Sequence, residues 1–76
     1  MERLAKLFGS SARLKTLRLF MFNRDSLFTL DEIAGRTKLS KETARHEATE
    51  LLDAELLRKK GERAAARYQV NPRFEH

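Results

Sequence analysis

Residues 29–54, which read TLDEIAGRTKLSKETARHEATELLDA, decide the fold of this chain. The segment opens with a threonine followed three residues later by a glutamate, Thr29 and Glu32. At this spacing each side chain accepts a hydrogen bond from the other residue's backbone amide, an arrangement known as a capping box. The pair therefore predicts a short helix from Leu30 to about Thr37. Its inward side chains are expected to be Leu30, Ile33 and Ala34.

A second helix start follows after a tight connection through Lys38 and Leu39. Ser40 offers a hydroxyl that can accept from an exposed amide of the next helical turn. This cap predicts a helix from Lys41 to about Ala54. Two short helices joined by about three or four residues form the helix-turn-helix pattern. The inward side of the second helix is expected to consist of Ala44, Ala48, Leu51 and Leu52.

The segment before this pair predicts another helix, capped by Ser10 or Ser11 and running to about Asn23. Apolar residues recur in it at helical spacing, which is typical of a buried face. Because apolar residues also lie outside that stripe, we expect this helix to be the central and most buried one. The expected stripe is Leu14, Leu17 and Met21, widened by Phe20. A further short helix is expected over residues 2–8, where Leu4, Leu7 and Phe8 share one side.

The last third of the chain predicts a β-hairpin over residues 57–70. Residues 67–70 alternate polar and apolar side chains, as a half-buried strand does, with Tyr68 and Val70 facing the helices. Residues 61–65 supply a turn with a positively charged tip, and residues 27–29 predict one further small strand. The expected fold class is mainly α with a small β-hairpin, as a single domain over residues 1–76.

Composition excludes several classes of protein. Apolar residues make up 41% of the 76 residues and charged residues 36%, too apolar for a disordered tail and too charged for a membrane span. The longest apolar run is residues 19–22, and no signal sequence is visible. Because the chain has no cysteine, disulfides and thiolate metal sites are excluded. We expect a cytoplasmic protein with no metal, no cofactor and no membrane partner.

Catalysis is not expected. His46 and His76 lie far apart in the sequence, and the chain has no glycine-rich phosphate loop and no Ser-His-Asp order. The acids Asp31 and Glu32 are adjacent, but Glu32 already serves as a cap. The sequence thus predicts a binding module and not an enzyme.

Charge is distributed unevenly along the chain. Sixteen basic and eleven acidic residues give a net charge of +5. Residues 1–24 hold six basic residues against one acid, residues 25–54 four against seven, and residues 55–76 six against three. A basic excess of this size favours a polyanion such as nucleic acid, with a well-solvated surface as the alternative.

Three stretches carry a resemblance to a known family: Leu7-Phe8-Gly9-Ser10 with Arg13, Glu32-Ile33-Ala34 to Leu39-Ser40, and Tyr68-Gln69-Val70-Asn71-Pro72. In this order and spacing the chain resembles the winged helix-turn-helix domains of small prokaryotic transcriptional regulators, in the ArsR-like grouping. The resemblance implies a three-helix core with a C-terminal wing, and sequence-specific binding of double-stranded DNA. It also implies transcription regulation and a possible homodimer, for which residues 2–8 are a candidate seam. The chain departs from the family at Lys38 and Glu55, where glycine is usual, and at Ala48, where leucine is common.

The resemblance also implies how DNA would be bound, with the helix from Lys41 in the major groove and the hairpin on the backbone and minor groove. Arg45 is the strongest candidate for reading a base, because its planar fork matches the two acceptors of guanine. The expected contacts of the recognition helix are Ser40, Lys41, Thr43, Arg45, His46 and Thr49. The expected contacts of the wing are Arg58, Lys59, Lys60, Arg63 and Arg67.

One feature of the recognition helix argues for a different role. It carries the acids Glu42, Glu47, Glu50 and Asp53 against only two basic residues, and unpaired carboxylates are repelled by phosphates. Arg45 itself could pair with Glu42 or Thr49 in place of a base. A winged-helix module for protein–protein interaction, without direct DNA binding, is therefore the alternative function.

Overall fold

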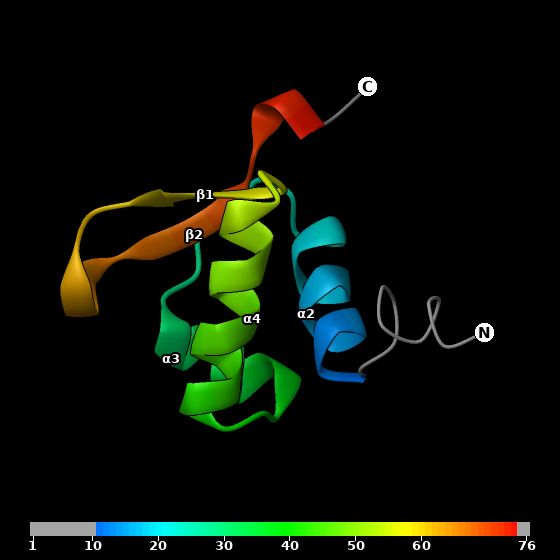
Figure 1. Ribbon diagram of the computed structural model, residues 1–76, viewed down its shortest axis with the longest axis vertical. Helices are drawn as coiled ribbons and strands as arrows, with labels where there is room; N and C mark the ends of the chain where they lie inside the picture. Colours follow the sequence, from blue (N-terminus) through cyan, green and yellow to red (C-terminus); the bar gives the residue numbers. More distant parts are fainter. Residues whose placement is uncertain (1–10, 75–76) are drawn as a thin grey trace.

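The computed structural model describes residues 11–74, which fold into three α-helices and a two-stranded antiparallel hairpin (Figure 1). The helices are α2 (Ser11–Met21), α3 (Leu30–Thr37) and α4 (Lys41–Asp53), and the strands are β1 (Leu57–Lys60) and β2 (Arg67–Val70). Two short 3-10 helices follow the strands, η1 (Arg63–Ala65) and η2 (Pro72–Phe74). The mainly helical class with a small hairpin is thus confirmed. The helix expected over residues 2–8 lies outside the described residues.

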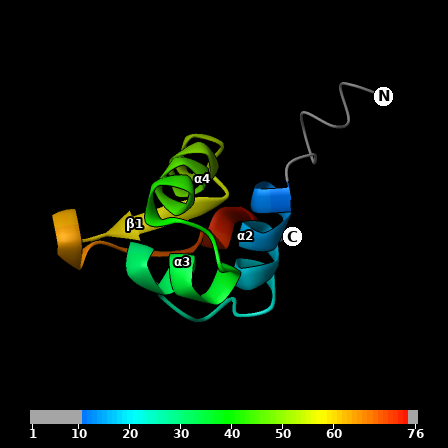
Figure 2. The same ribbon diagram turned by 90° about the horizontal axis from the view of Figure 1, so that it is seen from below.

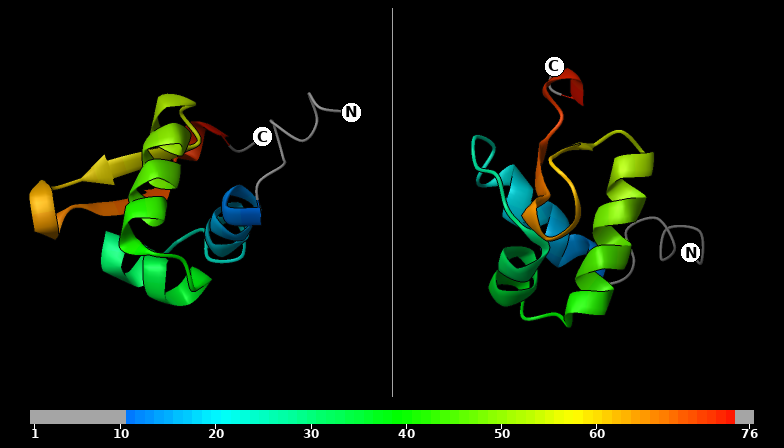
Figure 3. Two further views of the ribbon diagram at one scale, coloured as in Figure 1. Left: turned by 60° about the horizontal axis from the view of Figure 1, so that its bottom comes forward. Right: turned by 90° about the vertical axis from the view of Figure 1, so that its left-hand side faces the viewer.

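Both predicted helix caps are present. The Thr29 hydroxyl accepts from the Glu32 amide at 3.1 Å, and the Glu32 carboxylate accepts from the Thr29 amide at 2.8 Å. The Ser40 hydroxyl accepts from the Thr43 amide at 3.1 Å at the start of α4. Because these caps satisfy amides that have no partner inside the helix, they fix where α3 and α4 begin. Figure 3 shows the short turn between the two helices at the end of the molecule away from η2.

The core lies where the three helices meet the inner face of the hairpin. Phe20 and Phe28 contact each other edge-to-face, with ring centroids 5.5 Å apart. Ala44 and Ala48 are fully buried, so α4 packs closely against the other helices. The buried apolar residues are Phe20, Phe28, Ile33, Ala44, Ala48, Leu51, Leu57, Ala66, Tyr68 and Val70. The predicted positions Leu30, Ala34 and Leu52 are only partly buried at the edge of this core.

The inward face of α2 differs from the predicted stripe. Thr16 and Phe20 are fully buried, whereas Leu14 is 43% exposed and the neighbouring Phe22 is 80% exposed. Thr16 can occupy a core position because its hydroxyl donates to the Ala12 carbonyl at 2.8 Å. The prediction that this helix is the most buried one is wrong, since α2 buries two residues and α4 buries four. It also ends at Met21, two residues before the predicted end.

The hairpin is tied to the helices through its second strand. Tyr68 and Phe28 exchange two backbone hydrogen bonds, of 2.9 and 2.7 Å, so the small strand predicted at residues 27–29 is a single bridge at Phe28. Tyr68 and Val70 are buried against the helices, as predicted. From this base the hairpin extends beyond the helices on the side away from α2 (Figure 2). Within residues 11–74, no helix is long and apolar enough to cross a membrane.

Two of the positions where the family usually has glycine adopt left-handed backbone conformations. Lys38 has φ 62° at the C-terminal end of α3, and Glu55 has φ 64° after α4. A Cβ atom opposes this conformation, so a residue other than glycine is strained there. Both departures from the family therefore carry a cost in stability.

We expect Lys38→Gly and Glu55→Gly each to raise the free energy of unfolding by about 0.5–1 kcal/mol, because glycine tolerates positive φ. Thermal unfolding followed by circular dichroism measures the gain, at roughly 4–8 °C per kcal/mol for a domain of this size. The alanine variants at the same positions are the control, because alanine keeps the Cβ atom. An equal gain from alanine would show that removal of the charged side chain, and not backbone strain, is responsible.

Candidate nucleic-acid interface

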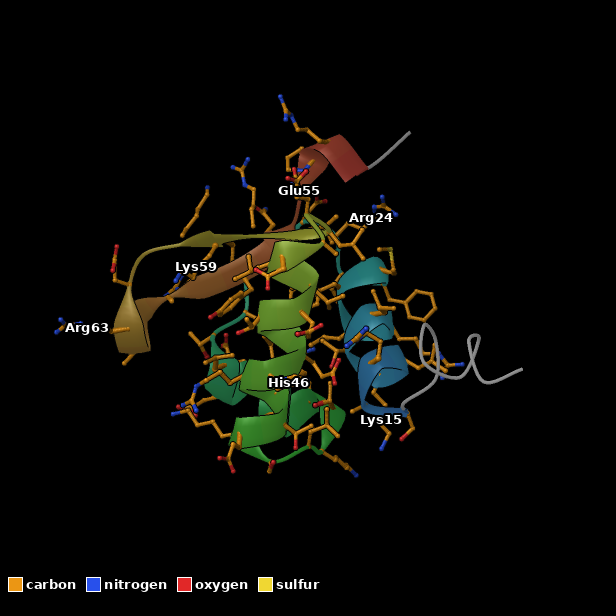
Figure 4. The ribbon with its side chains drawn as sticks, in the orientation of Figure 1. Lys15, Arg24, His46, Glu55, Lys59 and Arg63 are labelled. Atoms are coloured by element: carbon orange, nitrogen blue, oxygen red, sulfur yellow. The ribbon has the colours of Figure 1, made fainter. Side chains whose placement is uncertain are left out.

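A cleft of about 540 Å³ lies between one flank of α4 and the inner face of the hairpin. Lys41, Arg45 and Thr49 line it from α4, where a spacing of four residues stacks them on one flank. Lys59 and Arg63 line it from the hairpin. Five of the eleven residues predicted to contact DNA are thus brought together around one hollow. Arg63 lies at the far tip of the hairpin in Figure 4.

The cleft is strongly cationic. Its only acidic lining residue is Asp31, which pairs with Lys41 at a distance of 3.0 Å between Oδ1 and Nζ. Both of these side chains are more than half exposed, so the pair is weak and water competes for it. Arg45, Lys59 and Arg63 are exposed and make no ion pair or side-chain hydrogen bond with any residue between 11 and 74. Three cations are therefore available to an anionic ligand.

The other residues predicted on the recognition helix lie outside the cleft. The Ser40 hydroxyl donates to the Thr43 hydroxyl at 2.9 Å and caps the helix, so these two side chains are engaged with each other. Thr43 is half-buried. His46 is exposed on the outer face of α4 (Figure 4). Only the flank with Lys41, Arg45 and Thr49 faces the hairpin.

The cations predicted on the hairpin are divided between its two faces. Successive side chains of a strand point in opposite directions, and Leu57 and Tyr68 point into the core. Lys59 pairs with Tyr68 in the register and shares its inner face. The remaining three are exposed and lie on the outer face: Arg58, Lys60 and Arg67.

The acids of α4 are arranged differently from the sequence-based expectation. Glu47 is only 5% exposed, and its Oε1 accepts from the Arg13 Nε at 2.5 Å. Arg13 Nη2 also lies 3.9 Å from the Glu50 carboxylate. The expectation that Glu47 faces outward, unpaired, is therefore wrong. Its position three residues after Ala44, on the inward face of the helix, is the signal in the sequence that points to burial.

Sequence reasoning did not identify two residues that shape this region. Asp31 was assigned to no site but lines the cleft, and Arg13 entered only as part of the family resemblance. Arg13 links α2 to α4 across 34 residues of sequence, so no local pattern reveals its partner. Compared with known protein families, curated proteins and solved structures, this chain matches none of them.

Proposed function

We propose that this chain is a winged helix-turn-helix domain in which α3 and α4 form the helix-turn-helix and the β1–β2 hairpin forms the wing. Three helices followed by an antiparallel hairpin, in this order, support the assignment. The short capped turn between α3 and α4 is the element this motif requires. The inner face of the hairpin closes the core, as a wing does.

The function we propose is sequence-specific binding of double-stranded DNA in transcription regulation. The observation that carries it is the cationic cleft between α4 and the hairpin, with Arg45, Lys59 and Arg63 unpaired among the described residues. In this proposal α4 enters the major groove, and the sugar–phosphate strand beside that groove runs through the cleft. Cations along a phosphate strand supply affinity that depends on salt, while contacts to base edges supply sequence preference.

The arrangement of acids on α4 decides which side of the helix reads the bases. Glu47 is paired with Arg13 and turned inward, so it presents no charge to a phosphate. Glu42 and Asp53 remain exposed on the far side of α4 from the core. The helix therefore approaches DNA with its flank of Lys41, Arg45 and Thr49, and not with its outermost ridge.

Arg45→Ala is expected to flatten sequence preference, because the guanidinium fork of Arg45 is the group in the cleft best suited to guanine. A lost bidentate contact of this kind corresponds to about 1–3 kcal/mol of discrimination at one base pair. Selection from random duplexes, followed by fluorescence anisotropy on the selected site, measures it. His46→Ala is the matched control, because His46 is exposed on the same helix but lies outside the cleft. Unchanged preference in Arg45→Ala, or equal losses in both variants, would count against this reading mode.

A protein-interaction module is the second candidate, and one observation favours it. Leu14 and Phe22 expose apolar surface on the outer side of α2, where Arg18 is also exposed. Such a surface suits a protein partner more than a duplex. The two functions separate in one experiment, because a pure docking module shows no affinity for any duplex at low salt.

A further inference from the structure

The outer face of the hairpin carries cations that the cleft does not use. The register places Lys60 directly opposite Arg67, and Arg58 opposite Gln69. These three cations are exposed, and none of them forms an ion pair with a residue in the described range 11–74. A four-residue pair of strands thus presents positive charge on both of its faces.

The pairing of Lys60 with Arg67 has a cost that the fold itself does not explain. Like charges placed directly opposite on two strands repel each other and destabilise a hairpin. Lysine on an exposed edge strand can discourage aggregation, which accounts for cations on β1. It does not account for Arg67, since β2 is flanked by β1 on one side and by the Phe28 bridge on the other. An anionic partner on the outer face would relieve the repulsion.

The position of the hairpin indicates which anion this is. In the proposed binding mode α4 occupies the major groove and one phosphate strand lies in the cleft. The next feature along the duplex is the minor groove, about 6 Å wide, and beyond it the second strand. A sheet with side chains on both faces occupies about 10 Å, too thick to enter that groove but able to lie over it. Its outer face is then directed toward the second strand.

We propose that the hairpin straddles the minor groove and holds both strands of one duplex, with Lys59 on the strand in the cleft and Lys60 and Arg67 on the opposite strand. Arg63, at the tip, enters the groove between them. Its backbone has φ 55°, a strained conformation for arginine that aims the side chain from the end of the hairpin. This inference rests on the proposed function, because it requires a duplex bound at α4.

The test compares Lys60→Gln/Arg67→Gln with Lys15→Gln/Arg18→Gln, which removes the same types and number of charges from α2. Lys15 lies on the side of the molecule away from the hairpin (Figure 4). The first variant should lower the slope of log K against log salt by about 1.8, at roughly 0.9 for each phosphate contact, while the second leaves it unchanged. Hydroxyl-radical footprinting should show protection lost from one strand only. Lys59→Gln should lose protection from the other strand.

Several results would overturn the inference. Equal slopes and footprints in the two double variants would show that the outer face does not touch the bound duplex. If the outer-face variant keeps its footprint but no longer captures a second labelled duplex, the outer face binds separate DNA instead. If the parent protein binds no duplex at all, the proposed function fails together with the inference. Thermal unfolding of the Lys60→Gln/Arg67→Gln protein serves as the folding control, and we expect it to be at least as stable as the parent, because a repulsion is removed.

Discussion

An Arg13→Ala protein is expected to lose about 3 kcal/mol of its free energy of unfolding relative to the parent. The substitution leaves the Glu47 carboxylate, which is 5% exposed, without its charged partner between α2 and α4. Removal of one member of a buried pair costs about 3–5 kcal/mol, and the partial exposure of Arg13 favours the lower end. Denaturant unfolding at neutral pH measures the loss. Domains of this size are stable by only about 4–11 kcal/mol, so the effect is large.

Two further proteins make this result specific to the ion pair. Lys15→Ala removes an exposed cation from the same helix and should change stability by less than about 0.5 kcal/mol. Arg13→Met/Glu47→Leu replaces both partners with apolar side chains and should recover most of the loss, because no charge remains buried. If Arg13→Ala costs no more than Lys15→Ala, the pair does not hold α2 against α4.

The second large effect concerns the cleft. A protein in which Lys41, Arg45, Lys59 and Arg63 are all replaced by glutamine is expected to bind duplex DNA on the order of 10³-fold more weakly at 0.1 M salt. The salt slope should fall by about 3.6, at roughly 0.9 for each lost phosphate contact. Fluorescence anisotropy at several salt concentrations measures both quantities. The fold should survive, because all four side chains are exposed.

The matched control removes four exposed cations that lie outside the cleft, by changing Lys15, Arg18, Lys38 and Arg73 to glutamine. This control has the same net charge as the cleft variant, so a difference between the two reports position and not total charge. Comparable losses of affinity in both proteins would mean that DNA is attracted by the overall charge of the chain. The assignment of the cleft as the binding surface would then be wrong.

The parts of the fold that the sequence predicts well are those set by local hydrogen bonds. Thr29, Glu32 and Ser40 each satisfy amides within three residues, so the starts of α3 and α4 follow from the sequence alone. The inner face of α2 is not predictable in this way. Thr16 buries its hydroxyl only because the preceding helical turn accepts the proton, and its polar type conceals the core position.

The candidate site is predicted in its membership more than in its geometry. Arg45, Lys59 and Arg63 are named by the sequence and meet in the cleft. The division of the hairpin cations between two faces follows from strand alternation once the register is known, but the register depends on which residues pair across the turn. Glu47 is misjudged because a carboxylate is normally exposed, and its partner Arg13 comes from a distant helix.

The paired backbones of Phe28 and Tyr68 have a consequence for the nucleic acid. Because this bridge anchors the base of the hairpin to the start of α3, the spacing between the hairpin and α4 cannot adjust freely to its ligand. A duplex that touches both must accommodate by bending or by changing its groove width, at an energy that depends on base-step stiffness. Compliant pyrimidine–purine steps between the two contact points would then be favoured, even where no side chain reaches a base.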